Sequence, residues 1–189
     1  MTALGRAGIP ARCTREPGGS AGAEAIRRLL LDGADERWDA VGEALLFCAA
    51  RRDHVARLIE PALDLGDWVI CDRFADSTLA YQGYGRGLPF AELQALHRFA
   101  LGDFAPDLTL ILDLPVEEGL ARAARRSGSA DRFERLDPAF HERLRDGFRQ
   151  IAAAEPQRCV LIDASGDAAS VHRAVLAAVA ARLGVALDG

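Results

Sequence analysis

The chain contains no lysine, so all 23 of its basic side chains are arginines. This excludes any mechanism that needs a lysine amine, and it excludes a phosphate-binding loop of the form Gly-x-x-x-x-Gly-Lys-Ser/Thr within this chain. Cysteine is scarce. Cys13, Cys48, Cys71 and Cys159 are far apart and lack the close spacings of metal sites or redox pairs. We expect them to be buried free thiols in a reducing compartment.

Long hydrophobic runs are also missing. The longest apolar stretches are too short to span a bilayer, and no basic-plus-apolar leader opens the chain. The formal net charge is −5, whereas a general nucleic-acid binder is usually basic. At 189 residues, half of them hydrophobic, the chain can form one substantial core. These features predict a single cytoplasmic domain over residues 1–189, with neither membrane nor nucleic acid as a partner.

Short apolar runs alternate with longer amphipathic patterns along the chain. Strands are predicted at 68–71, 108–112 and 159–162, with a weaker one at 9–14. Because the three clear runs are apolar on both faces, we expect helices to bury them from both sides. Asp137-Pro138 is typical of a helix start. The alternation predicts an α/β fold with a parallel sheet flanked by helices.

In such a sheet, ligands bind beyond the carboxyl ends of the strands. Asp72 and Arg73 directly follow one predicted strand, and a glycine-rich segment that contains Arg15 follows the weak first strand. The guanidinium fork suits phosphate, and a neighbouring carboxylate can hold magnesium-bound water. A salt-bridged pair at the strand end explains Asp72 and Arg73 equally well.

Two groups of residues each allow two interpretations. Phe47 and Arg51 lie four apart on a predicted helix, so they share a face. That face either binds a base or places a core phenylalanine beside a surface arginine. Ser77, Tyr81 and Gln82 precede a run of glycines and are either ligand-binding groups or part of a solvated loop.

A basic helix end runs into a segment of small residues. Arg122, Arg125 and Arg126 fall at i, i+3 and i+4 before residues 127–131. This pattern is typical of a lid that closes over phosphates, or of an exposed charged helix. The histidines lie far apart on helical patterns, and we assign them no chemistry.

Taken in order, the motifs resemble those of the thymidylate kinase family, bacterial type. They are Thr14-Arg-Glu-Pro-Gly-Gly19, Leu46-Phe-Cys-Ala-Ala-Arg51, Asp72-Arg73 with Ser77 and Tyr81-Gln82-Gly83, and Asp131-Arg-Phe-Glu134. Each motif is weak alone, but the ordered set is specific and spans nearly the whole chain, from about residue 2 to residue 183. The resemblance implies a P-loop NTPase-like fold and a nucleoside monophosphate kinase. Such an enzyme transfers phosphate from ATP, with Mg²⁺, to dTMP, and the complete protein is a homodimer.

The resemblance also implies a role for each matched residue. On the acceptor side, Phe47 stacks on thymine, Arg51 reaches its exocyclic oxygen, Ser77 and Gln82 face the nucleoside, Tyr81 crowds the sugar, and Arg15 and Arg73 hold the phosphate. Asp72 lies near Mg²⁺, through water. Around the lid, at about 122–134, Arg122, Arg125, Arg126 and Arg132 close over the ATP phosphates, and Asp163, Ala164 and Ser165 are predicted to bind the same nucleotide.

The resemblance further implies a first, central strand and a P-loop, which this chain lacks. The difference is roughly 20–30 residues, and a missed upstream start codon or an incomplete gene explains it best. The alternatives are a loop-less pseudokinase that only binds thymidine nucleotides, a kinase for another nucleoside monophosphate, and an inert fragment. For the chain as it stands, we expect no turnover and poor stability. We also expect either a gap or a forced pairing between the strands that end at Cys71 and near Leu112.

Overall fold

The computed structural model describes residues 1–34, 37–125 and 132–187. Its strands are β1 (Ala11–Thr14), β2 (Trp68–Cys71), β3 (Thr109–Asp113) and β4 (Cys159–Asp163). β1 pairs with β2 and β3 with β4, both in parallel. Each predicted strand is present and shifted by at most two residues at either end. Parallel pairs flanked by helices confirm the predicted α/β class.

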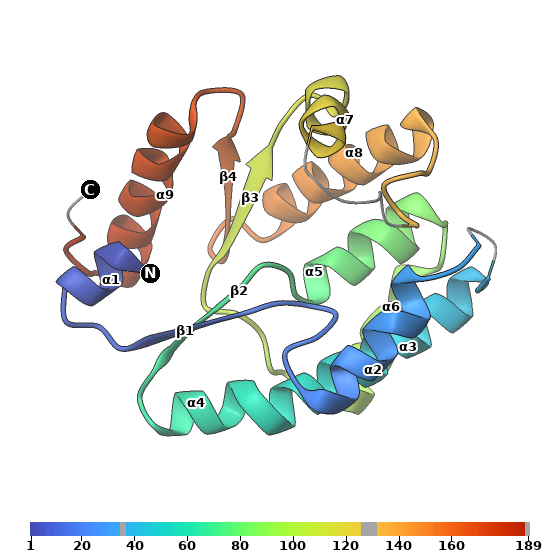
Figure 1. The fold of residues 1–189 in the computed structure, drawn as a ribbon, viewed down its shortest axis with the longest axis horizontal. Coiled ribbons are helices and arrows are strands. Elements are labelled where there is room, and N and C mark those ends of the chain that lie inside the picture. Colours follow the sequence, from blue (N-terminus) through green and yellow to red (C-terminus); the bar gives the residue numbers. More distant parts are fainter. Residues whose placement is uncertain (35–36, 126–131, 188–189) are drawn as a thin grey trace.

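The sheet is divided into two parts. Within the described residues, no pairing joins β2 to β3, so each strand leaves one edge open (Figure 1). Of the two expected arrangements, the gap is therefore the one that the structure has. An open edge leaves backbone N–H and C=O groups without ladder partners, which destabilises a sheet wherever water is excluded.

The expectation that the three clear strands are buried on both faces was wrong. Ile70, Leu112 and Leu161 are exposed by 39%, 55% and 44%. Apolar strand residues become buried only where another layer covers them, and the described elements leave part of these strands uncovered.

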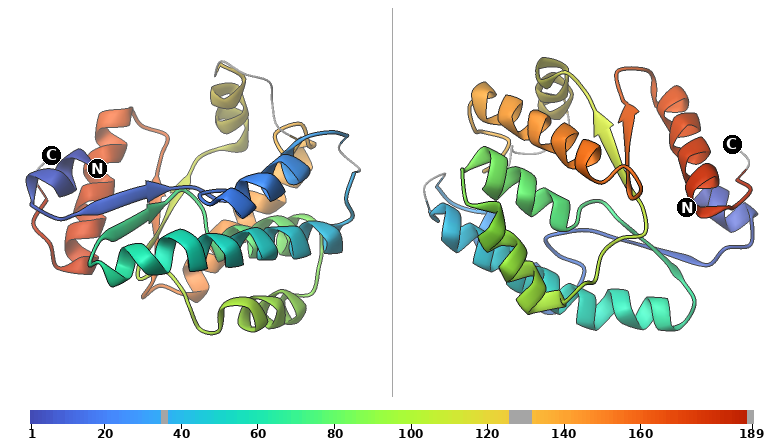
Figure 2. Two further views of the ribbon diagram at one scale, coloured as in Figure 1. Left: turned by 60° about the horizontal axis from the view of Figure 1, so that its bottom comes forward. Right: turned by 180° about the vertical axis from the view of Figure 1, so that it is seen from behind.

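The helices surround the two strand pairs. They are α1 (Thr2–Arg6), α2 (Ala21–Leu31), α3 (Ala40–His54), α4 (Glu60–Asp64), α5 (Ala75–Thr78), α6 (Phe90–Leu101), α7 (Val116–Ala124), α8 (Pro138–Ala154) and α9 (Ala168–Leu183). The π-helical segments η1 (Val55–Ile59) and η2 (Leu79–Gly85) extend α3 and α5 without a break. α8 and α9 lie on opposite sides of the β3–β4 pair (Figures 1 and 2).

Side-chain caps fix where several helices begin. Asp137 accepts a hydrogen bond from the Phe140 amide at the start of α8, where the sequence predicted a helix start. Asp39 and Asp167 cap α3 and α9 in the same way. Each cap satisfies an amide that has no partner inside its helix.

The main apolar core lies between α8, η2 and the β3–β4 pair. It includes Ile111, Phe140, Leu144 and Ile151. Gly85 allows α8 to approach η2, because a Cβ there would lie 2.6 Å from the Phe140 ring. This packing places the polar side chains of η2 against α3, where the candidate site begins.

Two composition-based expectations can be compared with the fold. All four cysteines are free; Cys48 and Cys159 are buried, but Cys13 on β1 is exposed, contrary to expectation. Among the residues that the structure describes, no helix has the length and apolar character needed to cross a membrane.

Candidate active site

Parallel pairing brings the segments after β1 and β2 together. The Glu16 amide donates to Asp72 Oδ1 at 2.9 Å, so the glycine-rich segment lies beside the Asp72-Arg73 pair. Arg15 is half exposed and pairs with Glu24 through Nη2 at 3.1 Å. The Gly19 amide, helped by Arg15, lowers the pKa of the Glu24 carboxyl. Arg15, Asp72 and Arg73 therefore lie at the carboxyl ends of neighbouring strands.

Arg73 is exposed and contacts Tyr81. Its Nη1 donates to the Tyr81 hydroxyl at 3.1 Å, and its guanidinium carbon lies 5.4 Å from the centre of the ring. The structure thus joins a cation suited to phosphate with the aromatic residue that we expect near the sugar. Ser77 lies half-buried in α5, between these two residues in sequence.

Three charged or titratable side chains near these residues are buried. Glu16, Arg51 and His54 are exposed by 5%, 4% and 0%. Arg51 Nε donates to Glu16 Oε2 at 2.7 Å, and His54 Nδ1 lies 3.1 Å from Glu16 Oε1. Buried charges persist only when they are paired, so this cluster fixes the shape of the segment after β1.

The cluster has two consequences for the predicted roles. Arg51 also donates to Thr78 Oγ1 and to the Phe74 carbonyl, so its guanidinium is already engaged. Its expected contact with a base stays a prediction. His54, to which the sequence assigned no chemistry, also lies 2.7 Å from Thr14 Oγ1. A Cβ at Gly19, where φ is +87°, would collide with the His54 ring.

An aromatic group lines the other side of the site. Phe133 is buried, with its ring centre 5.8 Å from that of Phe47 and 5.5 Å from that of Tyr81. Sequence reasoning quoted Phe133 within a motif but gave it no role. Its place next to Arg132 in the motif Asp131-Arg-Phe-Glu134 is the one feature of the sequence that could have pointed to a role for Phe133. The three rings form an apolar surface of the kind on which bases stack.

Gln82 and Arg132 lie deeper than their predicted roles suggest. Gln82 is exposed by 1% and donates through Nε2 to Glu43 Oε2 at 3.1 Å. Arg132 is fully buried and forms an ion pair with Glu43 at 2.8 Å. Neither side chain presents an open surface in this structure, so their contacts with substrates stay predictions.

The segments after β3 and β4 form the second part of the site. Arg122 on α7 donates to the Ala164 and Ser165 carbonyls at 2.9 and 3.3 Å. The Ser165 hydroxyl and amide both lower the pKa of Asp163. Residues 122 and 163–165, all predicted on the ATP side, therefore lie together. Arg125 is exposed at the end of α7, and Arg126 lies outside the described residues.

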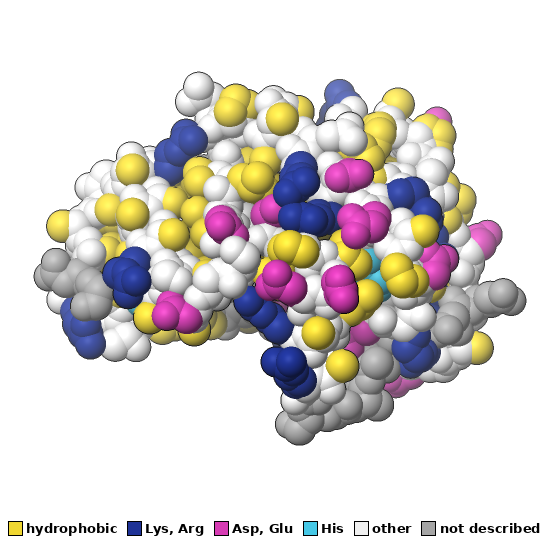
Figure 3. Space-filling model, turned by 90° about the horizontal axis from the view of Figure 1, so that it is seen from above, with side chains coloured by type: hydrophobic (Ala, Val, Ile, Leu, Met, Phe, Trp, Pro, Cys, Tyr) yellow, Lys and Arg dark blue, Asp and Glu magenta, His cyan; other side chains and the backbone are white. Residues whose placement is uncertain are grey.

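Charged side chains gather at the carboxyl ends of β3 and β4. Figure 3, which views the molecule from that end, shows arginine and carboxylate side chains around the middle of the face. Asp113, at the end of β3, accepts hydrogen bonds from Arg145 and Arg149, which lower its pKa to about 2. Its carboxylate is thus already engaged by two arginines.

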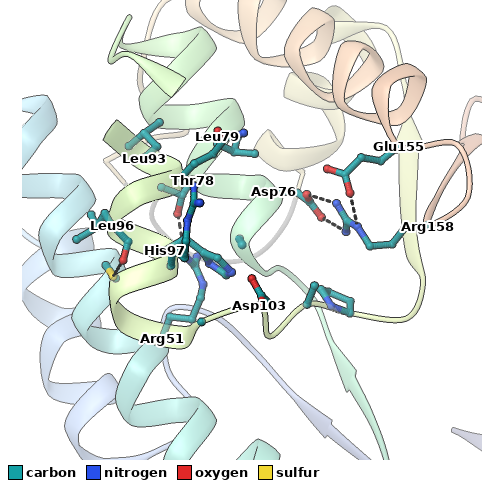
Figure 4. Close-up of a pocket in the computed structure, with 17 residues that line it drawn as sticks. Arg51, Asp76, Thr78, Leu79, Leu93, Leu96, His97, Asp103, Glu155 and Arg158 are labelled. Atoms are coloured by element: carbon teal, nitrogen blue, oxygen red, sulfur yellow. Dashed lines mark hydrogen bonds and ion pairs between the residues drawn. The ribbon is translucent and has the colours of Figure 1, made fainter. Parts of the chain in front are cut away.

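A pocket of about 430 Å³ lies next to this site rather than in it. Arg51, Thr78 and His97 lie on one side, and Arg158, held between Asp76 and Glu155, lies on the other (Figure 4). Its lining does not include the predicted phosphate-binding arginines of the β1 and β2 ends. We therefore do not take this cavity as the site of chemistry.

Asp72 is the described residue that best fits a metal ion. The described residues contain no cluster of three His, Cys, Asp or Glu side chains that could hold a metal by itself. Asp72 is exposed, and one of its oxygens accepts the Glu16 amide. A single carboxylate of this kind suits Mg²⁺ that is bound mainly by nucleotide phosphates and water.

Comparison with known proteins is consistent with this arrangement. A sequence profile described as Thymidylate kinase matches residues 1–175. Two proteins named thymidylate kinase, from Nitrobacter hamburgensis and Caulobacter vibrioides, are 56% and 55% identical to this chain. The matches cover 97% and 96% of this chain, and 80% and 87% of those proteins. The crystal structure of thymidylate kinase from Ehrlichia chaffeensis matches with a TM-score of 0.69 and 36% identity, over 89% of this chain and 80% of that one.

Proposed function

Because the chain belongs to the thymidylate kinase family, we propose that the protein, with a P-loop present, transfers the terminal phosphate of MgATP to dTMP, giving dTDP and ADP, and that these 189 residues alone do not turn over dTMP. The observation that carries this proposal is the contact between Arg73 and Tyr81 beside the rings of Phe47 and Phe133. This contact supports the proposal, because a cation of a kind that suits phosphate lies beside rings that suit a nucleoside.

The reaction needs positioning more than proton transfer. The acceptor is a phosphate monoester with a second pKa near 6, so it is largely a dianion at neutral pH and needs no strong base. Arg15 and Arg73, at the ends of β1 and β2, neutralise that charge and orient the phosphate for in-line attack. In this structure Arg15 Nε and Nη2 donate to Glu24.

The nucleoside side provides selectivity in this proposal. Phe47 stacks on the thymine, and Tyr81 occupies the space that a ribose hydroxyl would need. Ser77, Gln82 and Arg51 are proposed to contact the nucleoside. Arg51 also holds Glu16 and α5 in place through its hydrogen bonds to Glu16 and Thr78.

On the donor side, Arg122, Arg125 and Arg126 are proposed to act around the ATP phosphates, with Asp163, Ala164 and Ser165 near the same nucleotide; for Arg132 this role is implied by the resemblance alone. Bound Mg²⁺ would neutralise phosphate charge and hold the oxygens in line. Asp72 is the residue proposed to hold it, through water.

We also propose that the protein acts as a cytoplasmic homodimer. Val41 and Leu45 on α3 and Phe99 on α6 are exposed by 53%, 53% and 91%, and α3 packs against α6. Exposed apolar groups on two packed helices are typical of a protein interface. Light scattering of the purified protein measures the oligomeric state, and a monomer at all concentrations would contradict this part.

The deciding experiment measures both transfer and binding. Coupled assays of the protein extended by a P-loop, with dTMP, dUMP, UMP, GMP and AMP and with MgATP, should show a preference for dTMP. A preference for a purine nucleotide would overturn the assignment. The chain has no Gly-x-x-x-x-Gly-Lys-Ser/Thr loop, which favours one second candidate, a module that binds thymidine nucleotides without transfer. Calorimetric binding of dTMP without any transfer, even by the protein extended by a P-loop, would support that candidate.

A further inference from the structure

Glu43 and Arg132 are both completely buried although both carry a charge. Glu43 on α3 and Arg132 in the turn before α8 are exposed by 0%, and Arg132 Nη1 lies 2.8 Å from Glu43 Oε1. Arg86 Nη2 lies 2.9 Å from the same oxygen, and Gln82 Nε2 donates to Glu43 Oε2. The carboxylate therefore connects α3, the η2 region and the turn 132–135. Removing one member of a buried ion pair is costly, because charges inside a protein depend on their partners.

The same turn is also fixed to the end of α2. Arg132 Nε donates to the Leu30 carbonyl at 3.1 Å, and Arg135 Nη2 donates to the Gly33 carbonyl at 3.2 Å. Carbonyls at the last turn of a helix have no partner within that helix, so they are natural acceptors for arginine. The guanidinium of Arg132 thus contacts α2 and α3 at once, which a single lysine amine could not reproduce.

Phe133, the residue after Arg132, links this turn to the proposed nucleoside site. Phe133 packs against both Phe47 and Tyr81, and the Arg132 guanidinium carbon lies 4.6 Å from the centre of the Phe133 ring. The position of Phe133 therefore depends on where the backbone of Arg132 is held.

We propose that Arg132 and Glu43 form a positioning pair that sets the affinity for a thymidine monophosphate without touching it. The pair holds the turn 132–135 against α2 and α3, and Phe133 transmits this placement to the nucleoside site. The proposal rests on the proposed function for its ligand, and it differs from the family-based expectation that Arg132 contacts ATP phosphates.

The test compares four variants of the full chain. Arg132→Met removes the charge and keeps much of the side-chain volume. Arg132→Lys keeps the charge but loses the fork, and Glu43→Gln keeps the shape of its partner. Arg158→Met is the matched control, because Arg158 pairs with the buried Asp76 at 2.7 Å and is not part of the turn. Calorimetry measures the affinities for dTMP and ATP. Hydrogen exchange measures the opening of residues 132–136 in the absence of nucleotide.

We expect Arg132→Met and Glu43→Gln each to weaken dTMP binding about tenfold, with ATP affinity changed less than about twofold. Exchange at 132–136 should rise in both variants. Arg132→Lys should fall between wild type and Arg132→Met. Arg158→Met should lower the unfolding midpoint without raising exchange at 132–136.

Several results would overturn the proposal. One is a folded Arg132→Met protein with wild-type exchange and a dTMP affinity within about twofold of wild type. Others are equal losses of ATP and dTMP affinity, or an Arg132→Lys variant no better than Arg132→Met. If Arg132→Met does not fold, Glu43→Gln decides by the same measurements. If wild type fails to bind dTMP, the proposed function fails, and the exchange data still decide whether the pair holds the turn.

Discussion

The end of the site on β1 and β2 and the end on β3 and β4 differ in how their charges are held. At the first end, Glu16, Arg51 and His54 are almost fully buried and bonded to one another. At the second end, Arg122 is half exposed and rests on backbone carbonyls, while Asp163 is exposed and bonded to Ser165 two residues away. A preorganised end binds without an ordering cost, whereas the open end has to be ordered by its ligand.

The largest effect should come from breaking the buried cluster. Glu16→Ala leaves Arg51 and His54 buried without their carboxylate, so we expect a loss of about 3–5 kcal/mol in the free energy of unfolding. Urea denaturation measures this loss. Glu16→Gln, which keeps an acceptor oxygen, should lose less. A loss below about 1 kcal/mol for Glu16→Ala would mean that this end is no better organised than the other.

A second variant separates function from stability at the same end. Arg73 is exposed, so Arg73→Ala should change the free energy of unfolding by no more than about 0.5 kcal/mol. In the protein extended by a P-loop, loss of a phosphate clamp should nevertheless lower the transfer rate by a factor on the order of 10²–10³. The preference for dTMP over thymidine, measured by calorimetry, should fall as well. An unchanged preference would show that Arg73 does not contact the phosphate.

Acid titration tests how much the ion pairs of Asp113 with Arg145 and Arg149 stabilise the β3–β4 end. The folded pKa of Asp113 is about 2, below the unfolded value of about 3.9, because Arg145 and Arg149 bind the carboxylate. Its contribution is therefore fully present above about pH 4 and is lost as the pH falls toward 2, on the order of 2 kcal/mol. Asp113→Asn should remove this part of the pH dependence of unfolding. If the variant keeps the same acid profile as wild type, the arginine pairs contribute nothing.

Stacking on the aromatic surface should give a smaller effect. Phe47→Ala is expected to weaken dTMP binding by about 1–3 kcal/mol, because a base loses its stacking partner. Calorimetry measures the affinity, with Phe47→Leu as the control that keeps apolar volume without a ring. Unchanged affinity in Phe47→Ala would assign Phe47 to the core alone.

The smallest effect on stability is expected at the open end. Arg122→Ala removes two bonds to backbone carbonyls near the surface and should lower the free energy of unfolding by less than about 1 kcal/mol. ATP affinity should fall while dTMP affinity stays constant, as measured by calorimetry with each nucleotide. Equal losses for both nucleotides would show that the two ends are not independent.

Sequence reasoning located the strands and the charged residues that follow them. The strands are where periodicity predicted them, and parallel pairing of β1 with β2 brings Arg15, Asp72 and Arg73 to one edge. It failed on exposure at Ile70 and Leu112, because a strand's own pattern does not say which neighbours cover it.

The sequence also gave no sign of the charges that are buried. Glu16 lies in a glycine-rich motif, and His54 lies far from the other histidines in the sequence. Neither pattern tells whether the side chain is buried or exposed to solvent. Phe133 was visible as an aromatic residue beside Arg132, but its contacts with Phe47 and Tyr81 come from distant parts of the chain.

What the sequence alone determined is local: the α/β alternation, the helix starts and the charged residues that follow each strand. These depend on periodicity and on residues within a few positions of one another. Tertiary structure alone decided the division of the sheet, the engagement of Arg51 and the burial of Arg132. A charge can be buried only where partners converge on it, and the partners of Arg51 and His54 at Glu16 lie 35 and 38 residues away in the chain.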